Sequence, residues 1–281
     1  PYRNFVATDI VGVAMGGAMY LNGDDEHGPV RALAPQASAQ VNVQAATGTM
    51  IALYARGTND GVGQHVDVSM QEAVANTMDS AQPTWDILGV NNRGPGLRRM
   101  RGGELGPRYL FEAADGWIAG LHAAGLVGLK ADAVIDWLAE TDEAGDLGSP
   151  MWRSRLKSGQ PLSLDEMIYV EDTLNAFTKR RRKEDLIVEA QKRGAGWSPV
   201  YSPSEVVDAE QLRARDYWIR VRHDDIGESF IYPGAPFLMG ETPWMQRGRA
   251  PAVGEHNTEV YGDLLGLEPA EIRRLRMRMV V

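Results

Sequence analysis

The 281-residue sequence contains no cysteine. This absence excludes a disulfide framework and thiolate chemistry, and it is compatible with a reducing compartment, so we expect a cytoplasmic protein. The sequence also lacks an apolar run long enough to span a bilayer and a signal-peptide pattern, so we expect no membrane partner. Its five histidines show no metal-ligand spacing, and we expect no bound metal.

Acidic residues outnumber basic ones, 38 to 29. The net charge is -9, which argues against a general nucleic-acid binder. Neither a P-loop nor a dinucleotide fingerprint is present. What remains is ordinary for a globular protein, with 43% hydrophobic and 24% charged residues, and the length favours one or two domains.

The most informative stretch covers residues 59–74. Glycines permit a tight loop in 59–63, and Val66 and Val68 then alternate with polar residues, as in a strand with one buried face. Ser69 stands three residues before Glu72, which is the spacing of a helix capping box. The stretch therefore predicts a loop, a short strand and a capped helix, preceded by a helix from about Ser38 to Arg56.

Local patterns predict further elements. The turn residues Ala114-Asp115-Gly116, between two apolar runs, indicate a hairpin. Residues 91–108 are rich in glycine and arginine and indicate a mobile loop. We also expect a helix from Thr8 to Met15, continuation of the helix after Ser69 into the mid-80s with a break near Pro83, and mostly helices up to Arg193.

The order of helix, glycine loop, Gln64-anchored strand and capped helix resembles the middle of the class III CoA-transferases, a family that includes carnitine and formyl-CoA transferases and alpha-methylacyl-CoA racemases. Three later segments resemble other family patterns, and the likeness runs over nearly the whole chain. These segments are 196–203, Pro233-Gly234-Ala235-Pro236-Phe237 and Ala250-Pro251-Ala252-Val253-Gly254-Glu255-His256.

The resemblance implies an α/β fold, in which a Rossmann-like large domain carries an inserted small α+β domain and two chains interlock as a dimer. Residues 1–106 would form part of the large domain and linker helices, residues 107–198 the small domain, and residues 199–281 the return to the large domain. The opening residues resemble a segment that follows the family's first βα unit, so we expect that N-terminal part to be missing.

The resemblance also implies the activity, which is transfer of CoA from an acyl-CoA thioester to a carboxylic acid. The family's nucleophile is an aspartate, and its slot falls on or near Ser38, yet no Asp or Glu occurs from His27 to Asn59. Ser38 is then a helix N-cap, a nucleophile or a non-covalent holder of the acyl group. Asp9 matches a second acid of some transferases, and it either faces the thioester or places favourable charge in a first helical turn. Thr8 replaces the racemase histidine, which argues against a racemase.

CoA contacts are implied at Met70, which otherwise is a core residue, and in the arginine cluster of the glycine-rich loop. The cluster residues that we assign to CoA are Arg98, Arg99 and Arg101, with a solvated loop as the alternative.

The missing aspartate leaves two other functions open. The chain is then a non-catalytic CoA-binding subunit paired with an aspartate-bearing homologue, which makes a heterodimer an alternative to a homodimer. Otherwise it is an acyl-CoA lyase or hydrolase that acts through bound water.

Overall fold

A computed structural model describes most of the chain, which divides into two compact units, Pro1–Val200 and Tyr201–Val281. The side chains of residues 99–101 and 131 are outside the description. The described residues are 4, 6–23, 27–78, 81–92, 94, 96–101, 104–120, 131–158 and 160–281.

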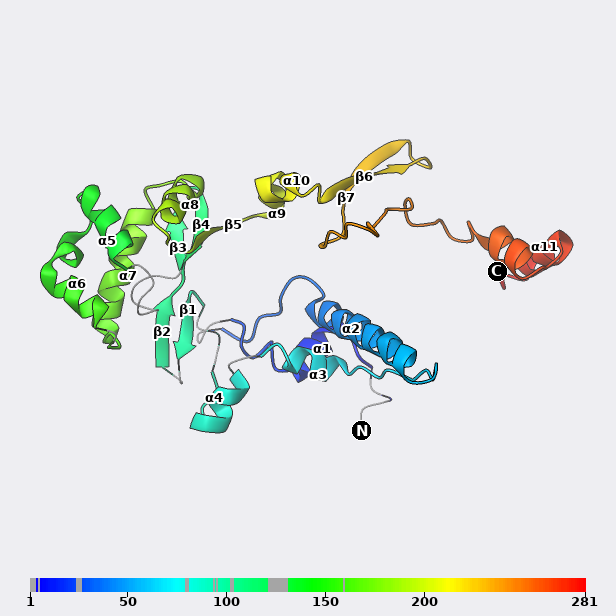
Figure 1. Ribbon diagram of the computed structural model, residues 1–281, viewed down its shortest axis with the longest axis horizontal. Coiled ribbons are helices and arrows are strands. Elements are labelled where there is room, and N and C mark those ends of the chain that lie inside the picture. The colour runs from blue at the N-terminus through cyan, green and yellow to red at the C-terminus, as the bar shows by residue number, and fades with distance from the viewer. Residues whose placement is uncertain are drawn as a thin grey trace. The chain divides into compact units, whose positions relative to one another are not determined.

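The first unit begins with helices α1 (Asp9–Met15), α2 (Gln36–Thr58) and α3 (Met70–Ala75), and Figure 1 shows α1 and α3 lying against α2. A small core of Val13, Ala37 and Val74 joins the three helices. The helix predicted to end at Met15 is confirmed, although the Thr8 side chain makes no capping hydrogen bond.

Two predictions for the stretch after α2 need correction. Residues 62–69 form neither a helix nor a strand, and they pair with no strand among the described residues, so the strand predicted at Val66 and Val68 is wrong. An alternating pattern supplies a buried face, but a strand also needs a hydrogen-bonded neighbour. The cap is confirmed, because Ser69 Oγ accepts a hydrogen bond from the Glu72 N–H at 3.3 Å.

The helix after Ser69 is also shorter than predicted. It ends at Ala75, and a separate helix α4 (Ala81–Leu88) follows, with Pro83 in its first turn. Proline is tolerated in a first turn because the amide that it lacks has no intrahelical partner there.

The segment predicted to be a mobile loop at 91–108 contains an antiparallel hairpin instead. Strand β1 (Arg98–Arg101) pairs with β2 (Glu104–Arg108), with an irregularity after Arg98. The interpretation as a loop was wrong. The hairpin is held by contacts with a buried carboxylate, described below, and the local glycine and arginine content does not indicate such a distant partner.

The predicted hairpin after Tyr109 is confirmed. Strand β3 (Leu110–Ala113) pairs with β4 (Gly116–Gly120), and β5 (Trp197–Val200) completes an antiparallel sheet in the order β3-β4-β5. The helices that pack beside it form the main core with the sheet. They are α5 (Ala131–Glu140), η1 (Gly145–Gly148), α6 (Pro150–Lys157), α7 (Leu164–Thr178) and α8 (Lys183–Lys192).

This core is aromatic. The rings of Trp137 and Phe177 meet edge to face at 4.8 Å, and Trp197 of β5 lies 5.7 Å from Trp137. Trp197 lies on β5, near the C-terminal end of the first unit, whereas Trp137 lies on α5. The core of residues 107–198 therefore joins segments that are far apart in the sequence. The division of residues 1–106 from 107–198 into domains stays a prediction.

The second unit contains one antiparallel hairpin and four short helices. Strand β6 (Trp218–His223) pairs with β7 (Glu228–Pro233). The helices are α9 (Pro203–Asp208), α10 (Glu210–Ala214), the π-helical η2 (Thr258–Leu264) and α11 (Pro269–Met277). Within the described parts of the chain, no helix has the length and apolar character that a membrane span requires.

Candidate functional site

The N-terminus of α2 gathers three of the residues singled out in the sequence. The first amides of a helix have no intrahelical acceptor, and the residue in the cap position here, Pro35, makes no side-chain hydrogen bond to them. Asp9 of α1 supplies one instead, because its Oδ1 accepts a hydrogen bond from the Ser38 N–H at 2.9 Å. The carboxylate of one helix therefore caps the next helix, 29 residues away.

Ser38 does not have the capping role that the sequence suggested. The helix begins at Gln36, so Ser38 is its third residue, and it takes part in capping through its amide and not through its hydroxyl. The helix starts two residues before the position predicted from the sequence, because its capping group comes from another helix and not from a residue at its own start. A nucleophilic role for Ser38 stays a prediction.

Two side-chain oxygens near this helix start are buried without a hydrogen-bond partner among the described residues. They are Oδ2 of Asp9 and Oε1 of Gln40. Such atoms are costly to leave unsatisfied, which makes the start of α2 a candidate functional site. Asp9 thus has one oxygen hydrogen-bonded to α2 and one buried oxygen without a hydrogen-bond partner among the described residues.

Met70 lies beside the same helix start. A side chain at Gly12 would collide with Met70 Sδ and with Cβ of Ala37, so Gly12 provides the room in which α1, α2 and α3 meet. Met70 is half-buried and packs against Val13, Ala37 and Val74. Its core-packing alternative is therefore observed, and the predicted contact with CoA stays a prediction.

Arg98 lies at a different place in the unit. Its Nη1 donates to Oε1 of Glu171 at 3.0 Å, and its Nη2 lies 2.5 Å from Oε2. The second contact is an ion pair. The Arg108 backbone N–H also donates to Oε1 at 2.8 Å. The side chains of Arg99 and Arg101 lie outside the described residues. The structure brings together Asp9, Ser38 and Met70, whereas Arg98 contacts Glu171 instead.

The sequence analysis did not identify Glu171, a buried carboxylate that is only 1% exposed. One signal was available. Val170, Leu174 and Phe177 have the spacing of a buried helical stripe, and Glu171 lies on that stripe. A carboxylate at such a position needs a cationic partner, which Arg98 provides.

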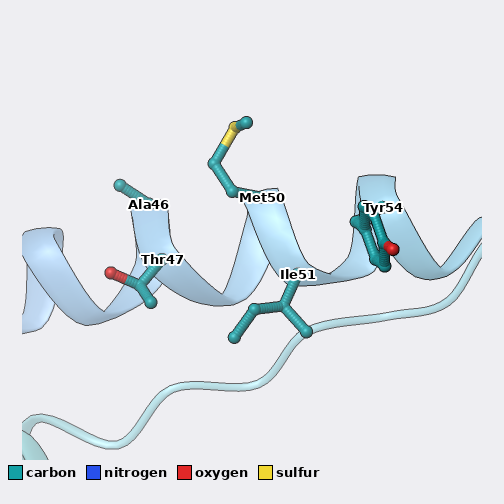
Figure 2. Close-up of a pocket in the computed structure, with 5 residues that line it drawn as sticks. All are labelled: Ala46, Thr47, Met50, Ile51 and Tyr54. Atoms are coloured by element: carbon teal, nitrogen blue, oxygen red, sulfur yellow. The ribbon is translucent and has the colours of Figure 1, made fainter.

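A different hollow lies on the outer face of α2. Figure 2 shows that its five lining residues all project from this one helix, and they include Met50, Ile51 and Tyr54. None of the described residues that line it is a lysine or arginine, so they offer no cationic partner for the phosphates of CoA. Across the described parts of the chain, no cluster of three or more potential metal ligands occurs.

Comparisons with known sequences identify related transferases. The chain is 29% identical over 262 residues to succinyl-CoA:(R)-benzylsuccinate CoA-transferase subunit BbsE of Thauera aromatica, which covers 92% of this chain and 62% of that protein. It is 27% identical to the succinyl-CoA–D-citramalate CoA-transferase of Chloroflexus aurantiacus, over 100% of this chain and 66% of that protein. The chain thus spans just under two thirds of the length of these relatives.

Solved structures show the same fold. A CAIB/BAIF family protein from Brucella suis matches with a TM-score of 0.71 at 17% identity, over 94% of this chain and 64% of that chain. The α/β fold class predicted from the sequence is confirmed by this likeness. The model of CoA-transferase family III matches residues 1–257, and the chain belongs to that family.

Proposed function

We propose that this chain belongs to an enzyme that transfers CoA from an acyl-CoA thioester to a carboxylic acid. Its relatives are named for reactions of this kind, and the family match extends over most of the chain. The observation that supports a site in this chain is the Asp9 carboxylate at the start of α2, next to the position where the family carries its nucleophile.

Asp9 is the carboxylate that we assign to the reaction. Oδ2 attacks the thioester carbonyl carbon, a carbon–oxygen bond forms, and the carbon–sulfur bond breaks with its electron pair leaving on the CoA thiolate. The product is a mixed anhydride. The thiolate then attacks the Asp9 carbonyl of the anhydride, the donor acid leaves as a carboxylate, and CoA is held on Asp9 as a thioester. The acceptor carboxylate reverses these two steps and leaves as the new acyl-CoA, which regenerates Asp9.

Ser38 contributes to this chemistry through its amide. The N–H that binds Oδ1 holds the carboxylate in place, and the start of α2 favours negative charge there. Met70, which packs against the small core at the start of α2, is the residue to which we assign a contact with CoA. No step in this scheme requires a metal.

A pocket-forming partner chain is also part of the proposal. Only Ala37 of the 23 residues in α2 is buried, and Met50, Ile51 and Tyr54 are each more than 60% exposed. A long helix with apolar side chains on several faces is normally covered. We propose a cytoplasmic homodimer, or a heterodimer with a homologous subunit, because one relative is itself named as a subunit.

The heterodimer carries the second candidate function, in which this chain binds CoA while an aspartate-bearing homologue performs the reaction. The absence of acidic residues from His27 to Asn59 favours it. The two functions differ in whether the Asp9 carboxylate reacts.

The test is a transfer assay of the purified protein with succinyl-CoA and formyl-CoA as donors and a panel of carboxylic acids as acceptors. Formation of new acyl-CoA that stops in an Asp9→Asn variant supports the assignment. Transfer that continues in that variant assigns the reaction to another group, and transfer that appears only with a co-purified homologue supports the subunit function. Free acid without an acceptor indicates hydrolysis.

A further inference from the structure

A second hollow lies between strand β2 and the start of helix α7, and its volume is 610 Å³. Pockets that bind ligands typically have roughly 300–1,000 Å³. Leu105 of β2 and Leu164 of α7 are 47% and 50% exposed, so both walls present a large apolar side chain to solvent. The apolar residues of the lining are Leu105, Pro107, Pro161, Leu162, Leu164 and Met167.

The edge of β2 that faces this hollow has no strand partner. Among the described residues, β2 pairs only with β1, in a sheet of two strands. Tyr109, the next residue after β2, donates its N–H to Leu97 O on the β1 side at 3.1 Å. Because successive residues of a strand point their N–H groups to opposite sides, the Arg108 N–H points away from β1, and it bonds Glu171 of α7. The outer edge of β2 therefore faces α7, and the two elements are in contact.

The opposite wall of the hollow is held in place by Arg155. Its guanidinium donates to Gln160 O at 3.1 Å and to Pro161 O at 2.7 Å, and it also bonds the Glu166 carboxylate. Ser163 and Glu166 form a capping box at the start of α7. This wall is thus ordered before a ligand arrives, which lowers the cost of binding.

The charge of the lining selects among ligands. Glu104 is the one charged residue among the described residues that line the hollow. Its carboxylate repels phosphates and other carboxylates, which disfavours the substrates of the proposed reaction, and it attracts a lysine or arginine. Pro107 has no N–H, so pairing with the edge is restricted to the residues before it, and an added strand is short.

We propose that this hollow is a docking site for a short extended segment of another protein, with apolar side chains and a lysine or arginine. An unpaired strand edge beside a helix, with apolar side chains between them, is suited to the addition of such a segment as a further strand. Every second side chain of the segment enters the hollow, and the basic side chain meets Glu104. The site is independent of the proposed transfer reaction.

Fluorescence polarisation of the full chain with the dye-labelled peptide acetyl-Lys-Leu-Val-Leu-Lys-amide tests the proposal. Binding should weaken by about tenfold in Glu104→Lys, and in Leu164→Asp, which places a charge in the apolar wall. The same peptide with N-methylated amides should also bind at least about tenfold more weakly, because it cannot donate backbone hydrogen bonds. Glu228→Lys is the matched control, since Glu228 is also an exposed glutamate that opens the second strand of a hairpin, in the other unit.

A charge exchange makes the test specific to Glu104. The peptide with glutamate in place of lysine should bind Glu104→Lys about tenfold more tightly than it binds the wild type. Absence of binding of the lysine peptide, equal binding of the methylated peptide, or equal weakening in Glu228→Lys overturns the proposal. Light scattering identifies the other occupant: self-association that Glu104→Lys abolishes, without peptide binding, assigns the hollow to a second copy and also overturns it.

Discussion

Removing the Arg98 guanidinium is the most informative perturbation of the β1–β2 hairpin. Arg98→Met would leave the Glu171 carboxylate, which is 1% exposed, with the Arg108 N–H as its remaining charge-stabilising contact of those described above. Breaking one partner of a buried ion pair costs about 3–5 kcal/mol. Because Arg98 is itself 22% exposed and one hydrogen bond to Glu171 survives, we expect a loss of about 2–4 kcal/mol.

A second substitution should recover part of this loss. Adding Glu171→Gln to Arg98→Met removes the uncompensated charge and keeps a side-chain oxygen for the Arg108 N–H. The double variant should therefore be more stable than Arg98→Met alone by about 1 kcal/mol or more. A surface pair provides the control, since Arg180→Met removes a 69% exposed partner of Glu143 and should cost below about 1 kcal/mol.

Urea unfolding followed by tryptophan fluorescence measures these differences, because Trp137 and Trp197 lie in the main core. Helix α7, which carries Glu171, contributes to the same core. The reasoning is refuted if Arg98→Met retains wild-type stability and instead weakens CoA binding. That result would place the guanidinium on a phosphate, as the sequence first suggested, and the contact with Glu171 would have no structural weight.

Three further predictions concern other contacts. Ser38→Ala should change the free energy of unfolding by less than about 0.5 kcal/mol, because its amide and not its hydroxyl is capped, whereas Asp9→Ala should cost about 0.5–2 kcal/mol; urea midpoints compare the two. Gly12→Leu should destabilise the first three helices by at least about 1–3 kcal/mol through overpacking, and a wild-type amide-exchange pattern there would contradict the described packing. A hydrogen bond from Arg155 lowers the pKa of Glu166 to about 2. The stability that this pair contributes is therefore present above pH 4.5 and lost as the pH falls towards 2, so the difference in midpoint between wild type and Glu166→Gln should shrink between pH 7 and pH 2.

Local signals account for the parts of the fold that the sequence predicted. The turn at Asp115-Gly116 and the cap at Ser69 each depend on residues within four positions of one another, and both are observed. The family patterns added the overall fold class.

The parts that were not predictable depend on distant partners. The β1–β2 hairpin is anchored by Glu171, 73 residues from Arg98. The start of α2 is capped by Asp9, and no pattern within the helix reveals it. At residues 62–69 the local pattern predicted a strand that the structure lacks, because these residues pair with no strand among the described residues. Local patterns describe what a segment can form, and its neighbours decide whether it does so.

In the proposed reaction, the hydrogen bond between Asp9 and Ser38 would link the stability of helix α2 to catalysis. If Asp9 becomes acylated, its carboxyl group loses its negative charge, and its remaining oxygen is a weaker acceptor for the Ser38 N–H. The first turn of α2 should then fray in the covalent intermediate and tighten again when the carboxylate is regenerated. The part of the capping energy that is lost on acylation would raise the free energy of the intermediate, so a stronger hydrogen bond between Asp9 and Ser38 would slow its formation.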